Sequence, residues 1–533
     1  MKTDTMNNMH KYPIGIQTFE RVRKDHYLYI DKTDLVWKIT KESPYIFLSR
    51  PRRFGKSLLS TTLHSYFEGR KDLFEGLKIM ELEKNWERYP VLHVDLSTAK
   101  NRVSSEQLRQ ALLSLLEPLV EQFGKSESEV SPGEVLRGLI RRAYEKTGKQ
   151  VVVIIDEYDA PLLDVLHDKE MLPDFRRTMQ EFYQPLKASE AMIRFCFITG
   201  ITKFSQLSIF STINNIKNIS LLPQFAAICG FTETELVTCM ADDIRQMAKF
   251  FECSPEEMQS KLKEQYDGYK FAQGSEDIYN PFSVMNAFSD KMLNNYWFES
   301  GTPTFLIRQM QEFKTDIMGL EHIEASASSF DRPTEAMTSA LPLLYQAGYI
   351  TIKSYDRETN SYVLAIPNKE VRVGLIDGLI PTYLGLDSGT VQDGFALKFW
   401  RALKKDNIED ALEEMKTFLA GIPYVEGFKK KLEDAAASEG FYEYTFYLIF
   451  SMMNVYARTQ VKCQGGRIDF VVKAPETYYV FELKVKGTAQ QALDQINSKG
   501  YALPYQTEGK NVVKIGIQFN RETMTIEDYL IER

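Results

Sequence analysis

One stretch, from Arg50 to Ser57 with the sequence RPRRFGKS, constrains the fold of this chain more than any other. It follows the apolar run Tyr45–Leu48 and precedes a segment of helical apolar periodicity, an order that predicts strand, loop and helix. This is the context of a phosphate-binding loop, in which helix N–H groups and the helix dipole attract phosphate. We expect Lys56 to reach the β- and γ-phosphates and Ser57 to ligate Mg²⁺. The other residues that we expect at the nucleotide are Phe54, Gly55 and Leu58.

The usual motif begins with Gly, whereas this chain has Arg50, so a basic turn before an ordinary helix is the alternative. A second stretch favours the nucleotide site. The apolar run Val151–Ile155 is typical of a strand buried on both faces, and it ends in Asp156 and Glu157. Carboxylates at the carboxyl end of such a strand lie where α/β sheets bind ligands. We expect Asp156 to hold Mg²⁺ and Glu157 to deprotonate the attacking water.

Further strands are predicted at residues 91–96 and 193–200, so the first half of the chain should form a parallel sheet with helices on both faces. Thr199, Thr202 and Lys203 lie at the end of the second of these strands and are candidate sensors of the γ-phosphate; an ordinary strand-ending turn is the alternative for each. We interpret His93 as structural. A short strand at residues 27–30, followed by a helix start with Asp31 or Thr33 as cap, is expected either near the base of the nucleotide or at the periphery.

Composition describes an ordinary globular protein, with 26% charged and 44% hydrophobic residues. A length of 533 residues is too great for one core. The net charge of −8 argues against a generally basic nucleic-acid coat and leaves a local basic groove open. Five cysteines without a C-x-x-C pair indicate reduced thiols and no zinc site. The start lacks an apolar signal core and no run approaches a membrane span, so we expect a cytoplasmic location and no membrane partner.

Helices are predicted from about residue 230 to 320, where two aromatic turns, residues 266–271 and 279–282, are interpreted as packing corners. A short helix, residues 341–347, then precedes two strands, 349–355 and 362–366, joined by a polar turn. Helix followed by β-hairpin is similar to a winged helix, and without a Lys/Arg cluster we expect it to pack on the nucleotide domain. The predicted regions are 1–225 (phosphate-loop domain), 226–330 (helical), 331–384 (winged-helix-like), 385–437 (helical connector) and 438–533 (small α/β domain).

The C-terminal region contains a predicted hairpin with three ionisable residues. Glu482 and Lys484 are two apart on one strand, so they share a face, and the hairpin can bring Asp469 beside them. Two carboxylates and a lysine are costly in a core but suit a Mg²⁺ site, where Lys484 would orient water or stabilise charge on the phosphate. A solvated hairpin face is the alternative. Glu443 could add a carboxylate, and a helix with Gln495 followed by Tyr501 comes after the hairpin.

Both halves of the chain resemble known families. Residues 12 to about 225 are similar to the AAA-ATPase-like family, whose phosphate loop also reads R-P-R-R-F-G-K-S without a leading Gly. Residues 438–533 resemble the PD-(D/E)XK nuclease superfamily, through Gly466-Arg467-Ile468-Asp469, Glu482-Leu483-Lys484 and the helix with Gln495. The two domains commonly occur fused in this order in bacterial proteins. The resemblance implies an ATP site of Lys56, Ser57, Asp156 and Glu157 and a nuclease site of Asp469, Glu482 and Lys484.

One departure from the nuclease pattern is residues 459–462, where relatives often carry an acidic residue and this chain has Thr-Gln-Val-Lys. Either Glu443 supplies the further carboxylate, or metal binding is weakened and the nuclease is slow or inactive. The leading hypothesis is an ATPase whose nucleotide state controls a Mg²⁺-dependent nuclease, with DNA favoured over RNA as partner and a homo-oligomer compatible with the sequence. The family association suggests defence against foreign DNA. The alternative is an ATP-dependent switch that binds without cutting.

Overall fold

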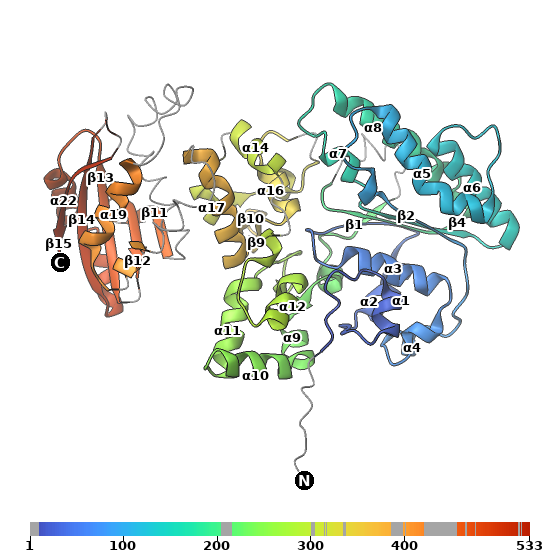
Figure 1. The fold of residues 1–533 in the computed structure, drawn as a ribbon, viewed down its shortest axis with the longest axis horizontal. Coiled ribbons are helices and arrows are strands. Elements are labelled where there is room, and N and C mark those ends of the chain that lie inside the picture. The colour runs from blue at the N-terminus through green and yellow to red at the C-terminus, as the bar shows by residue number, and fades with distance from the viewer. Residues whose placement is uncertain are drawn as a thin grey trace, which may run out of the picture. The chain divides into compact units, whose positions relative to one another are not determined.

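The computed structural model describes residues 10–203, 216–299, 304–313, 315, 317–333, 337–384, 398–399, 401–403, 405–420, 456–463, 466–474, 476–520, 523 and 525–533. The chain divides into two compact units, coloured along the chain in Figure 1. The first comprises residues 1–315 and 319–371, and the second comprises residues 316–318 and 372–533.

A five-stranded sheet organises the first unit, with its strands in the order β2-β3-β4-β1-β5 and every pair parallel. The strands are β1 (Tyr45–Ser49), β2 (Val91–Asp95), β3 (Val151–Asp156), β4 (Ile193–Gly200) and β5 (Lys217–Asn218). All six residues of β3 are buried, because helices cover both faces of the sheet. The predicted parallel α/β sheet is confirmed.

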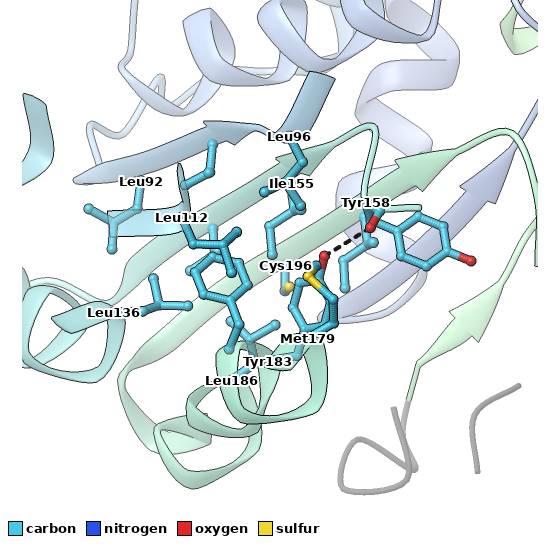
Figure 2. Close-up of a cluster of buried hydrophobic side chains, with 14 of the residues drawn as sticks. Leu92, Leu96, Leu112, Leu136, Ile155, Tyr158, Met179, Tyr183, Leu186 and Cys196 are labelled. Carbon is cyan, nitrogen blue, oxygen red and sulfur yellow. Dashed lines mark hydrogen bonds between the residues drawn. The ribbon is translucent and has the colours of Figure 1, made fainter. Parts of the chain in front are cut away.

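Helices lie on both faces of this sheet (Figure 1). On one face Val151, Val153 and Ile155 belong to a core built with α5, α6 and α8, part of which Figure 2 shows. On the other face Phe195 meets Phe67 of α3, with ring centroids 5.1 Å apart. The helices of this domain are α1 (Phe19–Lys24), α2 (Thr33–Glu42), α3 (Lys56–Phe67), α4 (Ile79–Leu82), α5 (Ser105–Phe123), α6 (Pro132–Thr147), α7 (Ala160–Leu163) and α8 (Met171–Ala188).

The strand expected at residues 27–30 is wrong. This segment has no strand pairing; the Tyr27 N–H donates to the Val22 carbonyl of α1 at 3.0 Å, and the Leu28 N–H donates to the Lys11 carbonyl at 2.8 Å. Leu28, Tyr29 and Ile30 of this segment line a cavity. The helix start that follows is correct, since Asp31 accepts the N–H of Thr33 at the beginning of α2.

The rest of the first unit is helical, with two small sheets. Its helices are α9 (Glu233–Cys239), α10 (Ala241–Phe250), α11 (Pro255–Tyr266), α12 (Pro281–Asp290), α13 (Tyr296–Glu299), α14 (Thr304–Glu312), α15 (Ala327–Phe330) and α16 (Leu341–Ala347). The predicted hairpin follows α16 as β9 (Thr351–Asp356) and β10 (Ser361–Ala365), and a third strand, β8 (Ile323–Ala325), pairs with β10. The other sheet pairs β6 (Phe231–Thr232) with β7 (Ile278–Tyr279).

This hairpin region packs on the phosphate-loop domain, as expected. A Cβ built on Gly348, at the end of α16, would lie 2.7 Å from the ring of Pro51 in the loop. Lys203, after β4, donates to the Asp331 carboxylate at 2.8 Å. Helix α17 (Lys369–Leu384) begins in the first unit, and the chain enters the second unit at Arg372.

The second unit is a five-stranded sheet with helices on both faces. The strands are β11 (Tyr456–Cys463), β12 (Gly466–Lys473), β13 (Thr477–Lys484), β14 (Asn511–Phe519) and β15 (Ile526–Glu532), in sequence order across the sheet. Only the β13–β14 pair is parallel. Helix α22 (Ala489–Ser498) packs on one face through Leu493 and Ile496.

Helix α19 (Ile408–Ala420), from the region expected to be a connector, packs against the other face of this sheet. Asp406, just before α19, accepts the hydroxyls of Thr477 and Tyr479 on β13. The Lys416 carbonyl accepts the hydroxyl of Thr525, at 3.1 Å. The helix therefore belongs structurally with the C-terminal sheet. Across the described part of the chain, no helix combines the length and apolarity needed to cross a bilayer.

Candidate functional sites

A cavity of about 390 Å³ lies at the phosphate loop. The loop and the first turns of α3 form its floor, and Lys100 and Glu157 also line it. The remaining walls come from segments far away in the sequence, namely residues 13–17, 28–32 and 228–231 together with Pro281, Phe282 and Met285. The segment expected either near the nucleotide base or at the periphery therefore contributes one wall of this cavity, through Leu28, Tyr29, Ile30 and Lys32.

The loop turns at two left-handed positions, Arg53 with φ 65° and Gly55 with φ 93°. Gly55 is the N-cap of α3, so Lys56, Ser57 and Leu58 form the first turn of that helix and all three line the cavity. The Lys56 ammonium donates to the Pro51 carbonyl at 3.0 Å. Free N–H groups at a helix start, a lysine and a left-handed turn together form a site suited to an anion.

The two carboxylates after β3 lie beside this loop and have different surroundings. The Asp156 carboxylate is hydrogen-bonded to the Ser57 hydroxyl; burial raises its pKa to about 6, against that bond and the nearby Lys56 charge. Asp156 is 2% exposed. The structure thus brings together the two residues predicted to ligate Mg²⁺, and a hydroxyl with a carboxylate is a donor set that this ion accepts.

Glu157 adopts a left-handed backbone, with φ 50°, and its carboxylate receives a hydrogen bond from the Lys100 ammonium at 3.2 Å. Burial acts to raise the pKa of Glu157, but the Lys56 and Lys100 charges outweigh it and leave the pKa below its usual value. Because the side chain lines the cavity, it is a charged carboxylate facing the space where a phosphate would lie. A general base needs that placement and protonation state.

The three candidate sensors at the end of β4 all have partners elsewhere. The Thr199 hydroxyl donates to the Leu48 carbonyl, and the Thr202 hydroxyl donates to Asp159, at 2.7 and 2.6 Å. Lys203 pairs with Asp331. None of the three belongs to the described residues that line the cavity. The sequence reasoning missed Asp159, whose buried carboxylate also accepts the N–H groups of residues 201 and 202 and so fixes the end of β4.

Arg50 was also missed as a structural residue. It is 2% exposed, and its guanidinium donates to the carbonyls of Ser49, Ser220 and Phe225, at 2.9, 2.9 and 3.1 Å. It also lies over the ring of Phe271, 4.2 Å from the centroid. Burial lowers the pKa of Arg50 to about 10, so the group keeps its charge at neutral pH. The side chain anchors the start of the loop and does not face the cavity.

The aromatic turn at residues 266–271 packs directly on the loop. The Phe54 ring is buried and stands edge-on to the rings of Tyr269 and Phe271, with centroids 4.8 and 5.3 Å apart. The interpretation as a packing corner is correct, and the surface it packs on is the phosphate loop. The second turn, residues 279–282, supplies Phe282 to the cavity wall, where the Arg53 guanidinium lies 4.9 Å from the ring centroid.

Among the residues that the structure describes, His93 belongs to no group of His, Cys, Asp and Glu side chains arranged to hold a metal. Its Nδ1 lies 3.3 Å from Nδ1 of His64, and burial together with that neighbour lowers its pKa to about 4. The structural interpretation therefore agrees with its surroundings.

The C-terminal carboxylates also come together. The antiparallel register pairs Phe470 with Phe481, so the next position places Asp469 opposite Glu482, on one face of the sheet. Asp469 accepts the Leu483 N–H at 2.9 Å. The Lys484 ammonium donates to Glu482, which is 1% exposed, at 3.0 Å.

Helix α22 covers this face closely. Gly516 of β14 is the partner of Glu482, and a Cβ built on it would lie 2.4 Å from the Ala489 carbonyl. Gln495 lies on α22 and is partly exposed, whereas Tyr501 is buried in the apolar cluster below the helix. Glu443 lies outside the described residues, as do the side chains of residues 459–462. Among the described residues, no group of three or more His, Cys, Asp and Glu side chains is arranged to hold a metal.

Comparison with known proteins agrees with this architecture. The sequence profile of a family described as a predicted AAA-ATPase matches residues 13–210, and that of the PD-(D/E)XK nuclease superfamily matches residues 437–529. A relative from Azotobacter chroococcum mcd 1, described as an uncharacterized protein in the vnfD 5' region, is 32% identical over 531 residues. The alignment covers 98% of this chain and 99% of the relative.

The chain belongs to the AAA-ATPase-like family and carries a PD-(D/E)XK nuclease superfamily domain. The predicted order of the two domains is confirmed. In the AAA-ATPase-like domain Lys56, Ser57 and Glu157 line one cavity, and Asp156 lies beside Ser57. In the PD-(D/E)XK domain it gathers Asp469, Glu482 and Lys484 on neighbouring strands. The residues missed, Arg50 and Asp159, gave no sequence signal beyond their positions next to the motifs.

Proposed function

We propose that this protein binds and hydrolyses ATP with Mg²⁺, and that its nucleotide state controls a Mg²⁺-dependent nuclease domain acting on nucleic acid, with DNA favoured. The observation that carries the first half is the contact of the Ser57 hydroxyl with the Asp156 carboxylate at the cavity that Glu157 lines. This arrangement supports the proposal, because Lys56, Ser57 and Glu157 line the cavity and Asp156 lies beside Ser57.

Each residue has a distinct role in this proposal. The start of α3 and Lys56 bind and orient the phosphates, and Ser57 and Asp156 hold the ion. Glu157 takes the proton from the attacking water, for which its lowered pKa keeps it ionised at neutral pH. Bound Mg²⁺ supplies neutralisation of the phosphate charge.

The nuclease half rests on Asp469 lying opposite Glu482 with Lys484 beside them. Mg²⁺ is commonly held by one or two carboxylates, with water or phosphate completing its shell, so two carboxylates fit such a site. Lys484 would orient water or stabilise charge on the phosphate. Defence against foreign DNA is the role that we propose from the family association.

A second candidate is a nucleotide-dependent switch that binds without cutting. The observation that favours it is that Glu482 already pairs with Lys484, while the described residues offer no third metal-ligating side chain at the site. Such a site would bind the ion weakly.

The decisive experiment is incubation of the purified protein with plasmid, single-stranded DNA and RNA, with and without Mg²⁺ and ATP, while ATP turnover is followed. Glu157→Gln should bind ATP without turnover, and Asp469→Asn should end cutting. Glu170→Gln and Glu476→Gln are matched controls, because both carboxylates are exposed. Binding without cutting under every condition would support the switch, and wild-type ATP turnover by Glu157→Gln would remove the assigned base.

A further inference from the structure

The phosphate loop receives a hydrogen bond from a distant tryptophan. Trp297, in α13, is buried, and its indole N–H donates to the Arg52 carbonyl at 3.1 Å. The indole ring stands edge-on to Tyr349, with centroids 5.1 Å apart, so its orientation is fixed. Because the peptide unit is planar and trans, fixing the Arg52 carbonyl also fixes the direction of the Arg53 N–H, on the opposite side of the unit.

That N–H belongs to the left-handed turn at Arg53, a residue that lines the cavity. Successive backbone N–H groups at such turns form concave anion sites. The direction of the peptide between Arg52 and Arg53 therefore bears on how the loop encloses a phosphate, and Trp297 sets that direction from behind the loop.

Trp297 is itself held by a buried carboxylate. Its backbone N–H donates to Glu370, at 2.8 Å, and Glu370 is 0% exposed. The hydroxyl of Ser283 donates to both oxygens of the same carboxylate, at 2.9 and 2.8 Å. Ser283 lies on α12, whose residues Pro281, Phe282 and Met285 line the cavity. The Glu370 carboxylate thus connects Trp297, which holds the phosphate loop, with α12, which forms one wall of the cavity.

Glu370 is the second residue of α17, the helix through which the chain passes from the first unit into the second at Arg372. The phosphate loop is therefore connected to the start of this helix through two successive hydrogen-bonded contacts, and α12 is connected to it through one.

We propose that Trp297 and Glu370 form a positioning relay: they set the phosphate loop for nucleotide and transmit its occupancy to the start of α17. The inference rests on the proposed ATP site and specifies its regulation. Neither residue touches the reacting atoms. Both act through the loop backbone and through α12.

Trp297→Phe tests the relay, because phenylalanine keeps an aromatic ring beside Tyr349 and removes the N–H donor. One hydrogen bond contributes about 1 kcal/mol, so the Kd for ATP should rise roughly 3- to 10-fold. Trp86→Phe is the matched control, since Trp86 packs on Tyr66 and Phe74 away from the cavity. Nucleotide-induced change in tryptophan emission should diminish in Trp297→Phe and persist in Trp86→Phe.

Hydrogen–deuterium exchange tests whether Trp297 and Glu370 transmit nucleotide binding, because residues with a purely structural role would not alter the response of α17 to ATP. In the wild-type chain, ATP should change exchange at residues 369–376, and Trp297→Phe at saturating ATP should abolish that change. Glu370→Gln keeps an oxygen acceptor for both donors and should retain the change, whereas Glu370→Ala should lose it.

The outcomes separate the two proposals. If wild type shows no ATP protection at the phosphate loop, the proposed ATP site fails and the relay with it. If ATP protects the loop while residues 369–376 do not respond, the relay alone is overturned, even if the variants cannot be folded. An unchanged Kd and exchange response in Trp297→Phe would overturn it equally.

Discussion

Asp156→Asn should stabilise the fold at neutral pH while removing ATP turnover. The pKa of the buried Asp156 carboxylate is about 6, against an ordinary value of 3.8. At 1.36 kcal/mol for each pKa unit, the ionised group costs the folded state as much as about 3 kcal/mol above pH 6. Asparagine carries no charge and keeps an oxygen acceptor for Ser57 and for the Glu157 N–H, so the variant should recover much of that free energy.

The pH dependence has a definite sign. Between pH 3.8 and 6 the folded state holds a proton on Asp156 that the unfolded state releases, so wild-type stability rises as pH falls through this window. The advantage of Asp156→Asn is therefore full above pH 6, about half at pH 5 and absent below about pH 4. With an unfolding entropy of roughly 2 cal/mol/K per residue, 3 kcal/mol corresponds to about 4 °C in Tm for the first unit.

The assay is thermal unfolding of wild type and Asp156→Asn at pH 8 and pH 5, with ATP turnover measured in parallel. Turnover should fall by more than the roughly 10- to 100-fold typical of losing a group that only supports a metal ligand. Glu170→Gln, an exposed carboxylate on the same domain, controls for a general effect of charge. A variant that is less stable at pH 8, or whose advantage is the same at both pH values, would refute the reasoning.

Three further predictions follow from named contacts. Lys100→Met removes a charge that lowers the pKa of Glu157, so the acidic limb of the pH–rate profile for ATP hydrolysis should move to higher pH; an unmoved limb contradicts the pairing. Asp469→Ala loses the acceptor of the Leu483 N–H, so its free energy of unfolding should fall by about 1 kcal/mol and its Tm should fall with it. Asp469→Asn should keep the Tm of the wild type and lose cutting. Equal Tm values for the two variants would contradict this. Arg50→Gly, which restores the usual loop residue, should destabilise the first unit by roughly 2–4 kcal/mol in denaturant unfolding, because three carbonyls lose their donor, and an unchanged midpoint would contradict it.

The sequence predicts those parts of the sites that depend on local pattern. The phosphate loop, the buried run before Asp156 and the alternation around Glu482 each lie within about ten residues, and the structure forms a strand, a turn or a helix at each. The register of strand pairing decides which residues on different strands face each other, and local pattern alone does not give this. That Asp469 stands opposite Glu482 follows from how β12 and β13 pair, although the short turn between them made that pairing predictable.

The sequence does not predict the long-range contacts that hold the phosphate loop in place. Trp297 meets Arg52 across 245 positions of chain, and Arg50 meets Phe225 across 175. Residues 27–30 show the complementary failure: a short strand was predicted there, whereas Leu28, Tyr29 and Ile30 line a cavity wall and pair with no strand. Lys203 was a reasonable sensor by position, yet its charge is satisfied by Asp331, which no local pattern connects to it.

Arg50 explains how a phosphate loop forms without its usual first glycine. Glycine is needed where the backbone must turn left-handed, and in this chain those turns fall at Arg53 and Gly55. The first position is therefore open to a side chain, and a buried guanidinium held by three carbonyls and the Phe271 ring ties the loop to residues 220–271. Tyr269 and Phe271 clamp Phe54 from the same segment. The loop conformation is thus set by the helical region as well as by its own sequence, and any change in that region on nucleotide binding must act on the loop directly.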